Sequence, residues 1–353
     1  MAIALIVLIL GEIALLLDLG NRLLGSYVRT PAGVFARFCI VVFACVFLAM
    51  PACLLLIHHG SDAGRYVFYG SSLIGLAIFI HYLFPYRFGI SRIRQARSVK
   101  RQGTLGPNLL LRSESVRVPS LSAGREALQF LVVSDLHCNT HEKLDLITGA
   151  FTKLSHDMFE AVLILGDLSE NGRILPELMS AVADLPSRHG IFLVRGNHDF
   201  EGGRDVLIED LARRHSIQML SNAWRHIAEL GIGLLGLECP YNQAHVPSDS
   251  GCDVTFGLSH TPDNIMHFSR LSVHVVVAGH THGGWFHLPV IGSLLVPCKL
   301  GRFLDKGWFR RGRTLMYVTS GLPYFADYRG QPGEILRLTV RPAEAKEGTA
   351  QVE

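Results

Sequence analysis

Residues that commonly bind metal ions recur directly after short apolar runs in this 353-residue sequence. The runs cover residues 128–134, 161–166, 191–196, 253–259 and 273–279. They are followed, in that order, by Asp135 and His137, by Asp167, by Asn197, by His260, and by His280 with His282. One Asp or His after a strand is usually a turn former or a helix cap. Seven such residues gathered together would be costly to bury without an ion, so we predict a metal site.

The ligand types narrow the choice of metal. Carboxylate and amide oxygens combined with imidazoles, without a thiolate, favour Mn(II), with Fe or Zn as alternatives, over Ca or a structural zinc–cysteine site. We expect an inert thiol at Cys138, beside His137. Seven ligands exceed the needs of one tetrahedral ion, so we predict two divalent ions that share a carboxylate. Two metals ~3.5–4 Å apart can activate water and stabilise the attacking and leaving oxygens of a phosphoryl displacement.

The elements that position these residues belong to a layered domain. From about residue 108, short apolar runs alternate with amphipathic stretches. This alternation predicts an α/β fold with helices outside a sheet. Each of the five runs before a ligand is predicted to be a strand, and ligand sites in open α/β sheets form at the carboxyl ends of strands.

The first ninety residues are much more apolar than the rest. Residues 2–19, 38–57 and 66–84 are each close to the ~20 residues that a helix needs to span a bilayer. We therefore predict a membrane anchor over residues 1–86 with about three transmembrane helices. Residues 2–19 have two alternatives, a helix lying in the membrane interface and a secretory signal peptide. The latter would require a basic N-terminal region and a small-residue cleavage site, which the stretch lacks.

A basic segment follows the third predicted span. Residues 87–101 contain six Lys and Arg residues and no acid, so the positive-inside rule predicts a multi-pass inner-membrane protein whose downstream part is cytoplasmic. We expect residues 87–107 to be a juxtamembrane segment and linker. Residues 108–340 are then the catalytic domain, and 341–353 a disordered polar tail.

Net charge and cysteine usage argue against a nucleic-acid-binding protein and against a disulfide-stabilised protein. The net charge is only +3, and the one cluster that mixes bases with aromatic residues spans 308–313, so nucleic acid is not an expected partner. Seven cysteines without a C-x-x-C pair do not predict a disulfide framework, which favours a reducing compartment. No protein partner is predicted.

The ligand series resembles a known family when it is taken in order. D-x-H (Asp135, His137), G-D (Gly166, Asp167), G-N-H-D (196–199), His260 and G-H-T-H (279–282) resemble the calcineurin-like metallophosphoesterase superfamily over residues 128–321. The resemblance implies a β-sandwich flanked by helices. It implies one ion held by Asp135, His137, Asp167 and His282, and another held by Asp167, Asn197, His260 and His280. Asp167 would bridge the two.

The same resemblance implies roles for residues that are not ligands. His198 would lie near the scissile phosphate and stabilise or protonate the leaving oxygen, while Asp199 orients it. Capping of the helix that follows is the alternative for Asp199. Arg195 is a candidate contact for a substrate phosphate, or simply the last outward residue of its strand.

Residues 279–312 resemble a membrane-attached subgroup that includes chlamydial-type UDP-2,3-diacylglucosamine pyrophosphatases of lipid A synthesis. That resemblance implies cleavage of a lipid-linked nucleotide at the cytoplasmic membrane surface, giving UMP and 2,3-diacylglucosamine 1-phosphate. Trp285 and the apolar residues after it are candidates for an acyl groove, or for an ordinary hairpin core. A broad phosphodiesterase or phosphatase for small esters is the rival function. Glu170 stands where many relatives place Asp, which leaves the substrate class open.

Overall fold

A computed structural model of the chain describes residues 2–25, 61–84, 88–93, 103–121, 125–238, 251–288, 292–322, 332–342 and 351–352. The chain divides into two compact units. The helical unit comprises Met1–Phe88 and Gly284–Phe303, and the sheet unit comprises Gly89–Gly283 and Leu304–Glu353. All seven predicted metal ligands lie in the sheet unit.

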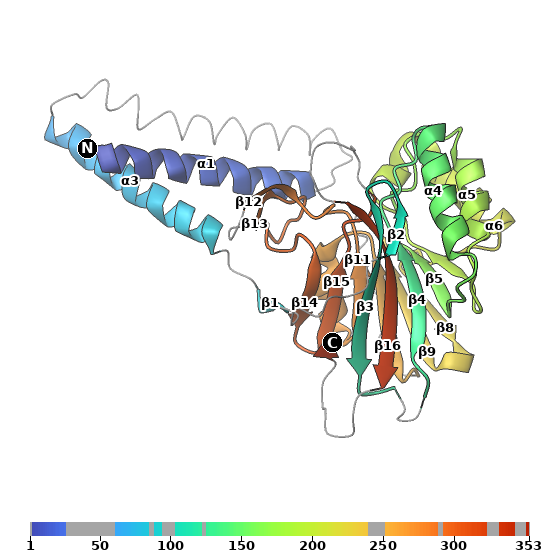
Figure 1. The fold of residues 1–353 in the computed structure, drawn as a ribbon. Helices are drawn as coiled ribbons and strands as arrows, with labels where there is room; N and C mark the ends of the chain where they lie inside the picture. The colour runs from blue at the N-terminus through green and yellow to red at the C-terminus, as the bar shows by residue number, and fades with distance from the viewer. Residues whose placement is uncertain are drawn as a thin grey trace. The chain divides into compact units, whose positions relative to one another are not determined.

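Two β-sheets form the body of the sheet unit (Figure 1). One has the order β17-β3-β16-β4-β5-β6-β7, with β2 paired to β3, and the other β1-β14-β15-β11-β10-β9-β8. The strands of the first sheet are β2 (Gly103–Gly106), β3 (Leu109–Val118), β4 (Leu128–Val133), β5 (Ala161–Ile164), β6 (Ile191–Leu193), β7 (Gln218–Met219), β16 (Gly333–Pro342) and β17 (Gln351–Val352). Those of the second are β1 (Ile90–Arg92), β8 (Trp224–Ile227), β9 (Ile232–Leu237), β10 (Val254–Ser259), β11 (Val275–Ala278), β14 (Gly307–Arg311) and β15 (Thr314–Val318).

The two sheets pack face to face over one hydrophobic core. Successive side chains of a strand point to opposite faces, and β4 illustrates the result. Phe130 and Val132 belong to the core between the sheets, whereas Leu131 and Val133 belong to the core beneath the helices. Phe130 meets Phe256 of the opposite sheet, with ring centroids 4.9 Å apart. Burial on both faces explains why this strand is a nearly continuous apolar run.

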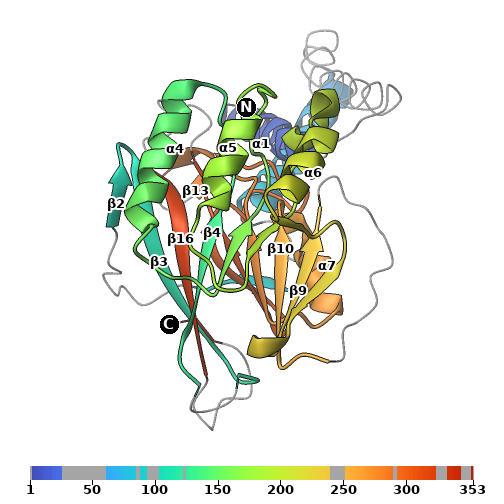
Figure 2. The same cartoon turned by 90° about the vertical axis from the view of Figure 1, so that its right-hand side faces the viewer.

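Three helices cover the outer face of the first sheet (Figure 2). They are α4 (His141–Leu154), α5 (Leu175–Ala183) and α6 (Arg204–Arg214). Helix α4 buries Leu144, Ile147, Phe151 and Leu154, the spacing of an amphipathic helix. The side chain of Thr140 caps it by accepting a hydrogen bond from the backbone N of Lys143. The remaining helical pieces are α7 (Ile265–Arg270) and the 3-10 turns His198–Gly203, Ala228–Leu230 and Pro262–Asn264.

Parallel pairing brings the predicted ligands to one edge of each sheet. Strands β4, β5 and β6 run parallel, as do β9, β10 and β11. All five strands predicted to precede ligands are present, as β4, β5, β6, β10 and β11. The prediction of a layered α/β fold with a sandwich and flanking helices is confirmed in the sheet unit.

Described strands lie outside two predicted boundaries. The expected linker carries strand β2, which pairs with β3 and buries Leu105, and β1 pairs with β14. The expected disordered tail carries β17, which pairs with β3. The sheet domain therefore begins before residue 108 and extends beyond 340. Strands β1 and β17 are held by hydrogen bonds to partners distant in sequence, and β2 is paired with β3 directly after it. Gly-rich and polar composition reveals none of these pairings.

Among its described residues, the helical unit has helices α1 and α3 and a hairpin (Figure 1). Helix α1 (Ala2–Gly25) packs against α3 (Asp62–Leu83). A Cβ atom on Gly11 would lie 2.3 Å from the Cα of Gly75, so the two backbones approach closely at this point. Residues 2–19 and 66–84 are thus helical as predicted, whereas the predicted span 38–57 lies outside the described residues.

Helices α1 and α3 are long and apolar enough to cross a membrane. The stretches that qualify are Ile3–Leu23 and Arg65–Leu83, of 21 and 19 residues. Only 17% and 22% of their apolar windows are buried, whereas the core helix of a soluble protein would be mostly covered. Exposed Ile3, Leu73 and Phe84 illustrate the apolar surface that results.

The hairpin of β12 (Trp285–Leu288) and β13 (Gly292–Leu295) is hydrogen-bonded to these helices. Asn21 of α1 bonds both the carbonyl of Leu294 and the backbone N of Val296, at 3.3 and 2.7 Å. The Tyr82 hydroxyl of α3 donates to the same Leu294 carbonyl at 2.6 Å. The guanidinium of Arg302 donates to the carbonyls of residues 82 and 83, at the end of α3. Residues 284–303 therefore fold with the N-terminal helices.

Candidate metal centre

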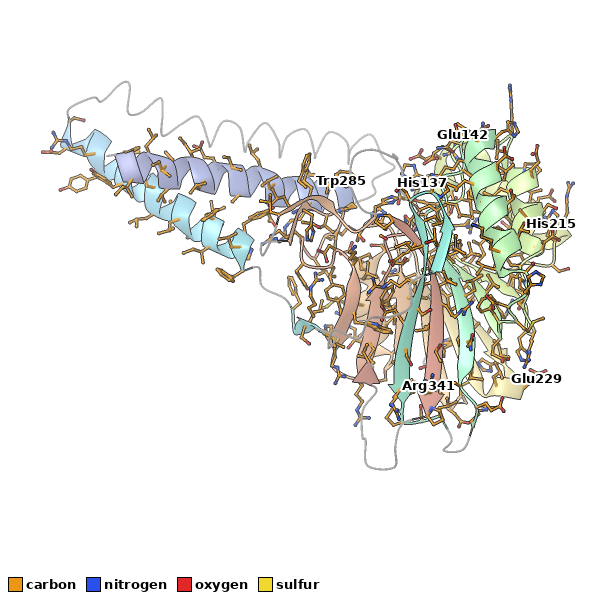
Figure 3. All side chains as sticks on the ribbon, in the orientation of Figure 1. His137, Glu142, His215, Glu229, Trp285 and Arg341 are labelled. Atoms are coloured by element: carbon orange, nitrogen blue, oxygen red, sulfur yellow. The ribbon has the colours of Figure 1, made fainter. Side chains whose placement is uncertain are left out.

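One group of ligands joins the ends of β4 and β11. Asp135 and His137 follow β4, and His282 follows β11. Nε2 of His137 lies 3.3 Å from Nε2 of His282, and His282 Nε2 lies 3.7 Å from Oδ1 of Asp135. Figure 3 shows His137 at the same end of the sheet unit as Glu142, which lies in the first turn of α4. This is the first predicted ligand set without its bridging carboxylate.

A second group joins the ends of β5, β6, β10 and β11. Its members are Asp167, Asn197, His260 and His280. Nε2 of His260 lies 3.2 Å from Oδ2 of Asp167, 3.0 Å from Oδ1 of Asn197 and 3.1 Å from Nδ1 of His280. Four donors from four strand ends thus converge on one point, as predicted.

Asp167 connects the two groups. Its Oδ2 atom lies 3.2 Å from His260 Nε2 in the second group and 3.7 Å from His137 Nε2 in the first. A carboxylate in that position fits the bridging role that the sequence resemblance implies. The two groups therefore suit a dinuclear centre.

The backbone is strained where the ligands stand. Asp135, His137, Asp167, His280 and His282 all have positive φ, between 41° and 70°, which non-glycine residues rarely adopt and which costs about 1–3 kcal/mol each. Glycines make room for these turns. A Cβ on Gly279 would lie 2.0 Å from the Ser134 hydroxyl and 2.4 Å from Oδ2 of Asp135. Strain concentrated on the ligand turns marks a functional site.

Hydrogen bonds fix which nitrogen of each ring faces the centre. Nδ1 of His137 lies 2.7 Å from a Glu170 oxygen, and Nδ1 of His260 lies 2.8 Å from the carbonyl of Leu165. Each Nδ1 therefore carries the hydrogen, which leaves a lone pair on Nε2. The Nε2 atom of His137 then faces that of His282. Converging lone pairs repel each other unless a cation lies between them, so these residues fit a metal ion.

Charge is unevenly distributed within the buried cluster. Burial raises the pKa of Asp167, but His260 and His137 outweigh it and hold that pKa well below its ordinary value. Burial lowers the pKa of His260, but Asp167 and Asp135 raise it to about 9. Burial together with His260 lowers the pKa of His280 to about 3. Without metal, a proton on His260 therefore offsets part of the negative charge of Asp167 and Asp135.

His198 is the imidazole that solvent can reach. Its side chain is 31% exposed, against 1% for His137. Its backbone N donates to Oδ1 of Asp167 at 2.9 Å, and its ring stands edge-on to His137 with centroids 5.2 Å apart. His198 thus lies beside the centre without belonging to either ligand group, where the resemblance places it.

Glu170 is the carboxylate that lies next to the His198 ring, where the prediction places Asp199. Its Oε1 atom lies 3.2 Å from Nδ1 of His198 as well as 2.7 Å from Nδ1 of His137. Burial raises the pKa of Glu170, but the hydrogen bond from His137 and its charge lower it to about 2. The residue that the sequence left without a role therefore contacts both a ligand and the solvent-accessible histidine.

Asp199 is instead a structural acceptor. Its buried carboxylate accepts hydrogen bonds from the backbone N atoms of Gly196, Asp167 and Leu168, at 2.7–2.8 Å. Burial and the charge of Asp167 raise its pKa to about 7. It ties the turn after β6 to the turn after β5, and its role in orienting the His198 ring stays a prediction.

The remaining candidates have other surroundings. The guanidinium of Arg195 makes two hydrogen bonds to Glu238, at 2.7 and 2.9 Å, and lies over the Phe200 ring, so its charge is already paired. Trp285 begins β12 in the helical unit, opposite Leu295. Cys138 is buried and burial raises its pKa to about 11, which disfavours the reactive thiolate.

Comparison with known families gives a match over the ligand-bearing region. Residues 128–284 match the model of the calcineurin-like phosphoesterase family. This region runs from β4 to the turn after β11 and includes all seven predicted ligands.

Three curated proteins illustrate the relatives of the chain. An uncharacterized metallophosphoesterase of Campylobacter jejuni is 26% identical over 61% of this chain and 58% of its own length. One of Helicobacter pylori is 28% identical over 56% of this chain and 55% of its own. The phosphodiesterase YaeI of Escherichia coli is 26% identical over 55% of this chain and 74% of its own. The chain thus spans less than two thirds of the length of the first two.

Proposed function

We infer that this chain is a metal-dependent phosphoester hydrolase with a dinuclear centre, which its match to the calcineurin-like phosphoesterase model and the names of its relatives support. The observation that carries the proposal is the position of Asp167. One carboxylate oxygen of this residue lies within 3.7 Å of His137 in one ligand group and of His260 in the other. A shared carboxylate is what two adjacent cations require.

The seven ligands form two sets that share Asp167. Asp135, His137, Asp167 and His282 would hold one ion, and Asp167, Asn197, His260 and His280 the other. The ions, when bound, would supply an activated water and neutralise charge on the phosphoryl oxygens. The protein contributes fixed ligand turns and shields part of the centre from water, since Asp135, His137, Asp167 and His260 are almost completely buried.

His198 acts on the oxygen that leaves. It is the exposed imidazole next to the ligand groups, so it can reach an ester oxygen and donate a proton or a hydrogen bond as negative charge develops. Glu170 holds the Nδ1 side of the ring. Nε2 is then the atom directed to substrate.

Two substitutions test the proposal. In detergent-purified protein with Mn(II) and bis(p-nitrophenyl) phosphate, His198→Ala is expected to keep two metal ions per chain and lose about 10²–10⁴-fold in kcat. Asp167→Ala is expected to lose both metal and activity. Full turnover by the His198 variant, or full metal content in the Asp167 variant, would refute these roles.

The proposed substrate is a lipid-linked nucleotide whose pyrophosphate bond is presented at a membrane surface and cleaved with water. The apolar α1 and α3 helices support attachment to a bilayer, and Phe286 and Leu288 of the β12–β13 hairpin are 64% and 40% exposed. We propose an inner-membrane, multi-pass protein with a cytoplasmic sheet unit that cleaves UDP-2,3-diacylglucosamine to UMP and 2,3-diacylglucosamine 1-phosphate. Incubation with this lipid nucleotide and Mn(II), with products resolved by mass, tests the bond that is cleaved.

A broad phosphodiesterase is the second candidate. The name of the Escherichia coli relative, phosphodiesterase YaeI, favours it. Such an enzyme would hydrolyse bis(p-nitrophenyl) phosphate with a much higher kcat/KM than the lipid nucleotide. The ratio of the two values therefore separates the candidates, and both share the same metal centre.

A further inference from the structure

A hollow of about 590 Å³ opens beside metal ligand His137. Its walls come from three places in the sheet unit: residues 107–109 before and at the start of β3, the stretch from His137 into the first turns of α4, and Leu322. We propose that this hollow binds the organic group of a phosphodiester, and that the group it fits is a nucleoside. The proposal rests on the phosphoesterase function inferred above and adds a recognition site to it.

Its position connects the hollow to the reaction. His137 lines it and also contributes Nε2 to the first ligand group. A phosphoryl group at the metals would therefore have one ester substituent on the side of His137, where the hollow begins. Ligand sites typically have volumes of about 300–1,000 Å³, so the hollow is large enough for a base and its sugar.

The wall beside His137 is held in place before any ligand arrives. Oδ1 of Asn139 accepts a hydrogen bond from the backbone N of Glu170 at 2.7 Å, and the Ser169 hydroxyl donates to the carbonyl of Cys138 at 2.5 Å. The Asn171 side chain donates to the carbonyl of Asn139 at 3.2 Å. The loop after β5 thus clamps the loop after β4. A preformed wall saves the ordering cost of binding.

The lining chemistry selects the class of ligand. Leu109 and Leu322 are buried and, with Leu146, provide an apolar floor. Asn108, Asn139 and Lys143 bring hydrogen-bonding groups to the same hollow. A nucleoside matches both, because the faces of its base are apolar and its edges and sugar hydroxyls are polar. An acyl chain would leave the polar groups unused, and a second phosphate would face Glu142 as well as Lys143.

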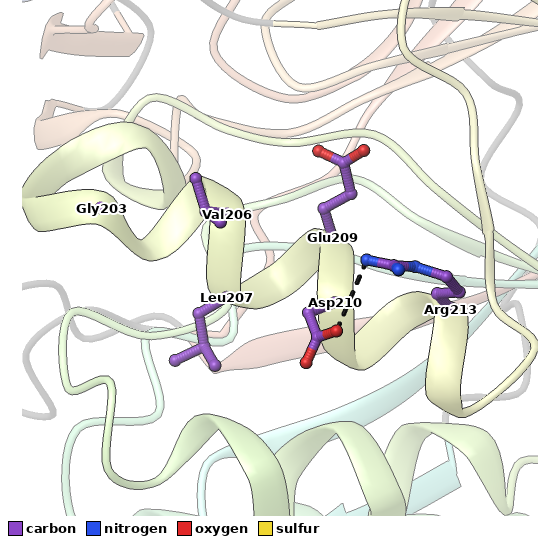
Figure 4. A pocket seen from close by; sticks show the side chains of 6 residues that line it. All are labelled: Gly203, Val206, Leu207, Glu209, Asp210 and Arg213. Carbon is purple, nitrogen blue, oxygen red and sulfur yellow. Dashed lines mark hydrogen bonds and ion pairs between the residues drawn. The ribbon is translucent and has the colours of Figure 1, made fainter.

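A hollow elsewhere on the unit provides a matched control. It has about 620 Å³ and is lined by Gly203, Val206, Leu207, Glu209, Asp210 and Arg213 (Figure 4). All these residues belong to α6 or immediately precede it, and none is a predicted ligand. A Trp at Val206, which is 69% exposed, therefore fills a space of similar size away from the metal residues.

The test compares two esters with the same leaving group. In the full-length, Mn(II)-loaded protein, kcat/KM is measured for p-nitrophenyl thymidine 5′-phosphate and for methyl p-nitrophenyl phosphate. Leu146→Trp is expected to lower the nucleoside-to-methyl ratio of kcat/KM about tenfold or more, the effect of losing a few pocket contacts. Val206→Trp is expected to leave both values unchanged. Calorimetric titration with uridine 5′-monophosphate is expected to show about tenfold weaker binding in the Leu146 variant only.

Further outcomes keep the two proposals apart. If the wild-type protein hydrolyses neither ester, the phosphoesterase function fails. If it hydrolyses both and the ratio in Leu146→Trp is unchanged, the nucleoside site fails while the function stands. A selective loss on decyl p-nitrophenyl phosphate instead would assign the hollow to an acyl chain and overturn the proposal. Should Leu146→Trp lose metal or fold poorly, Lys143→Met takes its place in the same measurement. It keeps the unbranched side-chain stem and removes the charge, and it is also expected to lower the nucleoside-to-methyl ratio of kcat/KM.

Discussion

The Oε1 atom of Glu170 lies 2.7 Å from Nδ1 of His137. A carboxylate behind a metal-binding imidazole fixes the ring and its tautomer and raises its basicity as a ligand. Glu170 therefore belongs to the metal centre although it is not a ligand. Glu170 stands where many relatives place Asp. The side chain is therefore one carbon longer at this position, and the carboxylate is kept.

Removing the charge of Glu170 should weaken the first ion. Glu170→Gln is expected to lower its affinity about 10–100-fold, the usual effect of losing such a partner. Metal content after dialysis against graded chelator measures it. Glu177→Gln, at a side chain 60% exposed, is the control and should behave as wild type. Equal affinities in all three proteins would remove Glu170 from the centre.

Asp199 should matter for stability more than for chemistry. Asp199→Ala leaves three buried backbone N–H groups without their acceptor. Because each costs about 1–3 kcal/mol when unpaired, we expect the free energy of unfolding to fall by about 3–5 kcal/mol. Denaturant unfolding of the metal-free protein measures this, with Asp210→Ala, at an α6 side chain that is 35% exposed, as control. A variant of unchanged stability that loses only kcat would restore the orienting role.

Metal affinity should rise with pH. In the metal-free protein, burial is outweighed by Asp167 and Asp135, and the pKa of His260 is raised from 6.5 to about 9. His260 therefore carries a proton below about pH 9, and the second ion must displace it. The apparent affinity should increase about tenfold per pH unit up to that point. Titration calorimetry in buffers of different ionisation enthalpy counts the released proton. A flat profile from about pH 6.5 to 9 contradicts this assignment.

The basic residues 94–101 should set the orientation in the membrane. A reporter fused after residue 353 is expected to be active in the cytoplasm, because Lys and Arg next to a span remain on that side. Replacing Arg94, Arg97, Lys100 and Arg101 with Gln removes most of this bias and should produce a mixed orientation. Periplasmic activity of the unaltered fusion would reverse the topology and remove the lipid-nucleotide proposal.

The metal centre could be predicted almost completely from sequence, because each ligand directly follows an apolar strand and parallel strands end at the same edge. Glu170 could not be placed, since its contacts depend on how the loop after β5 folds back on the loop after β4. The hydrogen-bond partners of Asp199 could not be predicted for a related reason. Its neighbour in sequence is His198, but its partners are backbone N atoms of two different turns.

The fold was predictable where the signal is local. The apolar runs specify β4, β5 and β6, whereas β1 and β2 contain little apolar sequence and exist because β14 and β3 offer them hydrogen bonds. The sequence of residues 285–295 is typical of a hairpin and does not indicate which other element it contacts. Its attachment to Asn21 joins residues more than 270 positions apart, which periodicity cannot reveal.

The hydrogen bonds from Asn21 and Tyr82 to the β12–β13 hairpin determine how the protein can be divided. A fragment starting at Gly89 would retain every metal ligand, yet it would carry residues 284–303 without the helices that hold them. Those residues begin two positions after His282. A water-soluble fragment for biochemistry should therefore replace 284–303 with a short Gly-containing turn, and the unshortened chain is the form in which to measure turnover of a membrane-borne substrate.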